Sequence, residues 1–299
     1  SGLHWFQTYF KHHIEKLGMT TSTFDPCLLI SKTNQFGIVG MQTDDTLIVS
    51  DENFLAQEEI ERAKANFTAK PIETLKEGGE VIFNGCIVSK DGPNLFVMQK
   101  KQGEKLIPID LTQSPEKVKQ AYVEQRARGA YIASICQPEA AFDLAVAAQH
   151  RNPGKAEVDL LNKRIKWQVA NQSRGLTYIP LGLATAKLFV FVDGSFANNS
   201  DLSSQLGYLI VLGNEKPEES QFKIRGNIIH WSSTKSKRVT RSVLASEILA
   251  MSESVDKGFV IAATLSQILK QLGLPPIPLV ICTDSFSLYE CLVKLGTTK

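Results

Sequence analysis

The sequence lacks the features of several protein classes. Its five cysteines are odd in number and form no CxxC pair, and its five histidines do not cluster with them. We therefore expect no disulfide framework and no zinc site, but reduced, mostly buried thiols. A signal-peptide pattern and a membrane-length apolar run are both missing, which predicts an intracellular protein, cytoplasmic or nuclear, without a membrane partner. The formal net charge of +2 provides no global basic field, so nucleic-acid binding would require a local patch.

The apolar pattern divides the chain into three regions. Residues 1–115 alternate short apolar runs with amphipathic segments, residues 116–183 have mainly helical patterning, and residues 184–299 return to strands and helices. These changes predict a multidomain protein of the α+β or α/β class. In the last region we expect a mixed sheet flanked by helices.

Individual elements follow from the same pattern. In the first region we expect helices at 3–17 and 53–67, strands at 27–31, 36–42 and 46–50, and a hairpin over 81–98, followed by a loop over 99–118. In the last region we expect strands at 188–195, 206–213, 227–233 and 278–285, and a helix over about 241–257.

Three acids of the last region form the strongest chemical feature. Asp193 ends the apolar run KLFVFVDGS, and Asp284 ends PLVICTDS. If a helical crossover makes these strands parallel neighbours, both acids emerge at one sheet edge, about 4.8 Å apart. Glu247 lies on an apolar helical stripe, where a charge needs a partner or a metal. Such ligands suit Mg²⁺ or Mn²⁺ and two-metal phosphodiester chemistry. The alternative is that the aspartates cap strand ends and Glu247 reaches solvent.

Two other polar segments have open interpretations. The segment WSSTKSKRVTRS lies beside the acids and carries candidate phosphate contacts. These are Ser233, Lys235, Lys237, Arg238 and Arg241; the alternative is a solvated charged loop. The segment QTDD sets Asp44 and Asp45 between two apolar runs, either as a hairpin turn or as half of a metal site.

Several segments resemble a known family. VDGSFANNSDLSSQLGYLIVL, IIHWSSTKSKRVTRSVLASEILAM and LVICTDSFSLYECL are similar to the RNase H domain of Ty1/copia-type (Pseudoviridae) retrotransposon polyproteins, in a style closest to fungal elements. GLHWFQTYFKHHIEKLGMTTSTFDPCLLI resembles the region after polymerase motif B, and QTDD lies where the family carries YVDD. FNGCIVSKDG resembles the primer-grip hairpin, and RARGAYIASICQPEAAFDLAVAAQ resembles the connection segment.

The resemblance implies a partial reverse transcriptase palm over 1–115, a helical connection over 116–183 and an RNase H-like domain over 184–299. Asp44 and Asp45 correspond to the catalytic pair of motif C, with Asp44 as the expected metal ligand. Asp193, Glu247 and Asp284 correspond to the first three RNase H carboxylates, which are catalytic and bind metal. The implied partner is an RNA–DNA hybrid or another nucleic acid.

The departures from the family limit the expected activity. Gln42 and Thr43 replace Tyr and Val, and the motif A acid of the family precedes the segment where this chain begins. The fourth RNase H acid would lie beyond Lys299, with Asp201 or Glu253 as possible replacements. We therefore expect no polymerase activity and weak or absent RNase H activity. The alternative is a domesticated, non-catalytic protein that binds nucleic acid or, through the sheet edge at PLVICTDS, a protein or a second copy.

Overall fold

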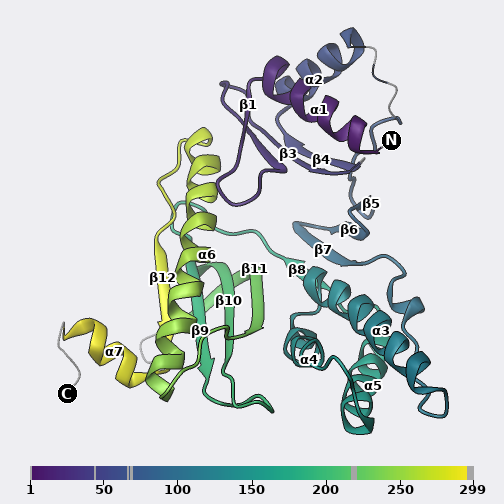
Figure 1. The fold of residues 1–299 in the computed structure, drawn as a ribbon. Coiled ribbons are helices and arrows are strands. Elements are labelled where there is room, and N and C mark those ends of the chain that lie inside the picture. Colours follow the sequence, from purple (N-terminus) through teal and green to yellow (C-terminus); the bar gives the residue numbers. More distant parts are fainter. Residues whose placement is uncertain (1, 44, 66, 68–69, 217–220, 295–299) are drawn as a thin grey trace.

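The computed structural model describes residues 2–43, 45–65, 67, 70–216 and 221–294. Over these residues the protein has a mixed α+β fold (Figure 1), and its strands form three four-stranded sheets. Two of the sheets are entirely antiparallel, and the third combines antiparallel strands with one parallel edge strand. Three separate hydrophobic clusters are present, one around the first sheet, one among the central helices and one around the last sheet.

The first sheet carries two helices on one face. Its elements are α1 (Gly2–Lys16), β1 (Met19–Thr21), β2 (Leu28–Ser31), β3 (Gly37–Gln42), β4 (Asp45–Ser50) and α2 (Glu52–Lys64). The buried side chains of Tyr9 on α1 and Phe54 on α2 pack with Leu29 and Val39 of the sheet. Asp51 caps the N-terminus of α2 because its carboxylate accepts a hydrogen bond from the Phe54 backbone N–H at 2.7 Å. The same carboxylate accepts a second hydrogen bond, from the Phe36 backbone N–H, also at 2.7 Å.

A group of buried polar side chains links α1 to α2. The Glu58 carboxylate is completely buried, accepts a hydrogen bond from the Tyr9 hydroxyl and lies 3.2 Å from Nε of Arg62. His13 is also fully buried, with Nδ1 2.9 Å from the Tyr9 carbonyl oxygen. Burial lowers the pKa of His13 to about 4, so the ring is neutral at pH 7.

The second sheet connects to the central helices. Its strands are β5 (Glu80–Phe83), β6 (Cys86–Asp91), β7 (Asn94–Gln99) and β8 (Leu176–Tyr178). The 3₁₀ helices η1 (Gly103–Lys105) and η2 (Pro138–Ala140) accompany the helices α3 (Pro115–Ile135), α4 (Ala141–Ala147) and α5 (Lys155–Ala170). Asn84 and Gly85 both have positive φ, 47° and 71°, as a two-residue hairpin turn between β5 and β6 requires.

The last sheet has the strand order β11-β10-β9-β12. Its elements are β9 (Lys187–Ser195), β10 (Gln205–Lys216), β11 (Lys223–Lys235), α6 (Val243–Gln271), β12 (Leu279–Thr283) and α7 (Phe286–Val293). Figure 1 shows α6 lying along the sheet, and buried residues of β9 such as Val190 pack against Ile261 of α6. The strand β12 lies at the edge of this sheet, where the sequence predicts it.

Side-chain contacts join the last sheet and α6 to the first sheet and to the central helices. In the loop between β1 and β2, Thr23 Oγ1 lies 2.8 Å from Oγ1 of Thr264 on α6, and the Phe24 ring packs edge-on against His230 of β11. Across the sheet, the Trp231 indole N–H donates to the Ala133 carbonyl of α3 at 3.1 Å. The last sheet therefore contacts both the first sheet and the central helices.

The predicted elements are present, with several differences. The predicted helix over 241–257 continues to Gln271, and the hairpin over 81–98 contains a third strand because Asn84–Gly85 makes a second turn. The short β1, β8 and α7 were not predicted, and the predicted loop over 99–118 contains η1 and the start of α3. The expectation of mostly buried thiols was wrong, since all five cysteines are free but only Cys136 is buried. Within the described residues, no helix has the length and apolar character needed to cross a membrane. The boundaries near 115 and 183 stay predictions.

Candidate metal centre

Strand register brings the two predicted aspartates together. The strand β12 pairs with β9 in parallel, with Thr283 opposite Val192, so the next residues on the two strands are Asp284 and Asp193. Both carboxylates are exposed at this end of the sheet. The predicted adjacency is therefore confirmed, and its cause is a crossover through α6 that brings β12 to the edge of β9 opposite β10.

Glu247 completes the group from the first part of α6. One ligand oxygen from each of Asp193, Glu247 and Asp284 lies within 4.8 Å of the others. The helix begins after Ser242, whose hydroxyl oxygen accepts a hydrogen bond from the Ala245 N–H at 3.1 Å. Among the described residues, this is the one cluster of acidic, histidine or cysteine side chains with metal-binding spacing.

A close approach of β9 to α6 sets the position of Glu247. A Cβ atom on Gly194 would lie 2.6 Å from the Ser246 carbonyl oxygen and 2.8 Å from the Glu247 backbone nitrogen. The completely buried Ser246 hydroxyl donates to the Gly194 carbonyl at 3.0 Å and lies 2.7 Å from the Val243 carbonyl. The glycine and the serine together hold this turn of α6 directly against the strand that carries Asp193.

The electrostatics of the cluster favour a bound cation. Glu247 is only 6% exposed, and its Oε2 atom has no hydrogen-bond partner. Burial, and then the charges of Asp193 and Asp284, raise the pKa of Glu247. A buried carboxylate beside two others is unfavourable unless it is protonated or shares a cation with them. These oxygen donors can therefore hold a metal ion, with two exposed ligands facing solvent and one buried ligand beneath them.

Asp201 and Glu253, the possible replacements for a fourth acid, lie outside this cluster. Asp201 is exposed and forms an ion pair with Lys235, and Glu253 is exposed on α6. The Lys235 ammonium, together with the hydroxyl and N–H of Ser203, holds the pKa of Asp201 well below its usual range. Neither side chain belongs to the metal-binding group formed by the described residues.

The acids of QTDD have a different environment. Asp44 lies outside the described residues. Asp45 begins β4, pairs with Gln42 across the turn and is exposed. Its Oδ2 accepts a hydrogen bond from the Asn84 backbone N–H at 3.2 Å, which links the first sheet to the β5–β6 turn. This contact gives Asp45 a structural role, and it belongs to no metal-binding group among the described residues.

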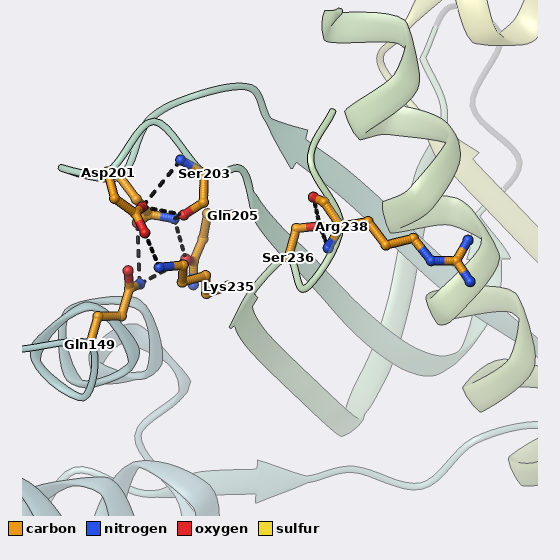
Figure 2. A network of polar contacts seen from close by, with 8 residues as sticks. Gln149, Asp201, Ser203, Gln205, Lys235, Ser236 and Arg238 are labelled. Atoms are coloured by element: carbon orange, nitrogen blue, oxygen red, sulfur yellow. Dashed lines mark hydrogen bonds and ion pairs between the residues drawn. The ribbon is translucent and has the colours of Figure 1, made fainter. Parts of the chain in front are cut away.

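The predicted phosphate contacts separate into two sets. Lys235 is paired with Asp201, and Ser233 Oγ accepts a hydrogen bond from the Gln205 amide at 2.9 Å. Lys237, Arg238 and Arg241 are exposed in the loop between β11 and α6. Figure 2 shows Arg238 extending away from the Asp201 network, toward α6. The free basic charge therefore lies in the loop and not at the end of β11.

An amide network next to these residues was not predicted. Gln149, which follows α4, donates to Gln205 at 3.3 Å (Figure 2). Gln149 also donates to Asn199 at 3.2 Å, and Asn199 donates to Gln205. Isolated Gln and Asn residues in polar loops carry no sequence signal of burial. Gly194 and Ser246 were also missed, although a glycine directly after a strand-end acid is a signal of close backbone approach.

The comparisons with known proteins give this chain no relative. No family model, no curated protein and no solved structure matches it.

Proposed function

We propose that this protein is a metal-dependent phosphodiester hydrolase of the RNase H type that acts on the RNA strand of an RNA–DNA hybrid. The observation that carries the proposal is the convergence of Asp193, Glu247 and Asp284, with an unpartnered buried oxygen on Glu247. The substrate class comes from the resemblance to Ty1/copia-type polyproteins and from the exposed basic loop beside the acids. Mg²⁺ or Mn²⁺ is the proposed cofactor, because both accept carboxylate oxygens.

Each acid has a separate part in the proposed reaction. Asp193 and Asp284, which are exposed, contribute the oxygens nearest to the substrate. Glu247, which is buried, contributes the metal-binding oxygen on the protein side. A divalent cation held by these three acids would supply Lewis-acid chemistry, polarising a phosphoryl oxygen and lowering the pKa of a bound water. Lys237 and Arg238 contribute positive charge for the nucleic-acid backbone, which fixes position and not sequence.

The test of this function is cleavage of a labelled RNA–DNA hybrid in Mn²⁺ or Mg²⁺. The wild-type protein is expected to cleave the RNA strand, and Asp193→Asn to lose about 100-fold or more, because losing a metal ligand costs several kcal/mol of transition-state stabilisation. Asp256→Asn is the matched control, since Asp256 is an exposed acid of α6 outside the metal-binding group. Cleavage that is equal in wild type and Asp193→Asn would contradict the proposal.

A second candidate function is nucleic-acid binding without hydrolysis. The exposed basic loop with Lys237, Arg238 and Arg241 favours it, because that surface does not depend on the metal ligands. This function predicts hybrid binding that weakens with salt and with charge removal in the loop, but no metal-dependent cleavage. The cleavage assay therefore separates the two candidates.

A further inference from the structure

We propose that a crevice between α3, α4 and β11 binds one nucleotide unit of the strand that crosses the metal centre, with Arg126 and Ser233 contacting its phosphate. This inference rests on the proposed function, because it places the same nucleic acid at a second point of the sheet. It adds a binding site on the central helices that the family resemblance does not indicate.

Strand register aligns the crevice with the metal centre. Asp193 lies opposite Gly207 on β10, and Gly207 lies opposite Ser233 on β11. Directly opposed residues project from the same face of a sheet, and neighbouring strands are about 4.8 Å apart, which puts Ser233 about 10 Å from Asp193 on one face. Gly207 between them has no side chain, and a Cβ atom there would meet nothing closer than 3.8 Å. At this position of the sheet, therefore, β10 places no side chain between Asp193 and Ser233.

The crevice has the size and lining of a site for a small unit. Its volume is about 270 Å³, which is at the lower end for ligand sites. Small side chains such as Ala130, Ala145 and Ala148 line it together with the buried Leu144, and Trp231 lines the β11 side. The indole of Trp231 is fixed by its hydrogen bond to Ala133. A preformed, mainly apolar surface of this kind can receive one sugar of the hybrid's backbone while the bases stay paired.

The polar groups of the crevice favour an anion. Arg126 lines it and is half-buried, and no ion pair or hydrogen bond of Arg126 occurs among the described residues. Two positions along α3, Arg128 is instead neutralised by Glu124, with Nη2 2.8 Å from Oε1. The Ser233 hydroxyl oxygen accepts from Gln205, which leaves its proton free to donate. A guanidinium and a hydroxyl donor at one opening are typical contacts for a phosphate oxygen.

The neighbouring amide network keeps this opening in place. Gln205 of β10 accepts a hydrogen bond from Gln149 (Figure 2) and donates one to Ser233, so β11 is linked through β10 to the residue that follows α4. Lys235, further along β11, is already paired with Asp201. Arg126 is therefore the basic residue, among the described residues that line the crevice, that can meet a phosphate there.

The test is hybrid affinity, measured by fluorescence anisotropy with a short labelled RNA–DNA hybrid in EDTA. The parent is the full chain with Asp193→Asn, which prevents cleavage and removes one of the three clustered carboxylates. Arg126→Ala is expected to raise Kd about 5- to 10-fold at low salt and to reduce the slope of log Kd against log salt by about one phosphate contact. Arg126→Lys should retain the slope, Ser233→Ala should raise Kd about 3-fold, and the control Arg128→Ala should match the parent.

Three outcomes separate this site from the metal centre. If the parent binds the hybrid and Arg126→Ala binds equally well, the crevice site is overturned while the metal centre stands. If Arg126→Ala has the expected effect but wild type cleaves nothing in Mn²⁺, the crevice site is supported and the hydrolytic function fails. If the parent shows no salt-dependent hybrid binding, the crevice site is overturned together with nucleic acid as the substrate.

Discussion

Glu58→Ala is expected to unfold the helical layer of the first sheet locally. The substitution removes a fully buried carboxylate that accepts a hydrogen bond from the Tyr9 hydroxyl and balances the charge of Arg62. Breaking a buried pair from one side leaves an uncompensated charge and costs about 3–5 kcal/mol. Amide hydrogen exchange, followed by mass spectrometry on peptides from α1 and α2, should therefore accelerate about 100-fold or more.

The neighbouring residue offers the control for this prediction. Glu59 is exposed on the next position of α2, so Glu59→Ala should leave the exchange of both helices within about twofold of wild type. Peptides from β9 and β10 should be unchanged in both variants, because these strands belong to a separate hydrophobic cluster. Exchange in α1 that is equal for the two variants would show that the Glu58 network contributes little.

Gly194→Ala is expected to disrupt the metal centre by displacing the turn of α6 that carries Glu247. The added Cβ would lie 2.6–2.8 Å from three backbone atoms of Ser246 and Glu247, and backbone atoms cannot rotate away as a side chain can. The contact forces α6 away from β9, costs about 2–3 kcal/mol of stability and moves Glu247 away from Asp193. We expect Mn²⁺ affinity to fall by about 10-fold or more, because a ligand displaced from its position no longer completes the site.

Gly207→Ala is the matched control for this effect. Gly207 lies opposite Asp193 on β10, but a Cβ atom there would have its nearest neighbours at 3.8 and 3.9 Å. Its Mn²⁺ affinity should equal that of wild type, and its stability should change by less than about 1 kcal/mol. Calorimetric titration and thermal unfolding of both variants measure these quantities. A Gly194→Ala protein with wild-type Mn²⁺ affinity would show that the close packing of β9 against α6 does not position Glu247 for metal binding.

The central part of the candidate site was predictable from the sequence. The apolar runs that end at Asp193 and Asp284 place both acids at one sheet edge on the condition that the two strands are parallel neighbours, and β9 and β12 meet that condition. The apolar stripe around Glu247 predicts a buried acid, and Glu247 is 6% exposed. The strand ends and the helical stripe are visible in the sequence because strand and helix periodicity are local properties. The pairing of β9 with β12 joins distant segments and is known only from the structure.

Other features depend on contacts between distant segments. The pairing of Lys235 with Asp201 joins residues 34 positions apart, so the sequence alone could not show that this lysine is neutralised. The hydrogen bond from Asn84 to Asp45 likewise links two sheets, and it gives a structural role to an acid for which a catalytic role was expected. The crevice beside Ser233 exists only because α3 and α4 pack against β11, which no single segment encodes.

The most direct test of the metal centre is a calorimetric titration of the metal-free protein with Mn²⁺, compared with Asp193→Asn. Three carboxylate oxygens within 4.8 Å of one another predict saturable binding by wild type, and at least about 10-fold weaker binding by the variant. Binding should also raise the melting temperature of wild type but not of Asp193→Asn. Equally weak Mn²⁺ binding by both proteins would show that Asp193, Glu247 and Asp284 do not form a metal centre but only a cluster of acids at the end of the sheet.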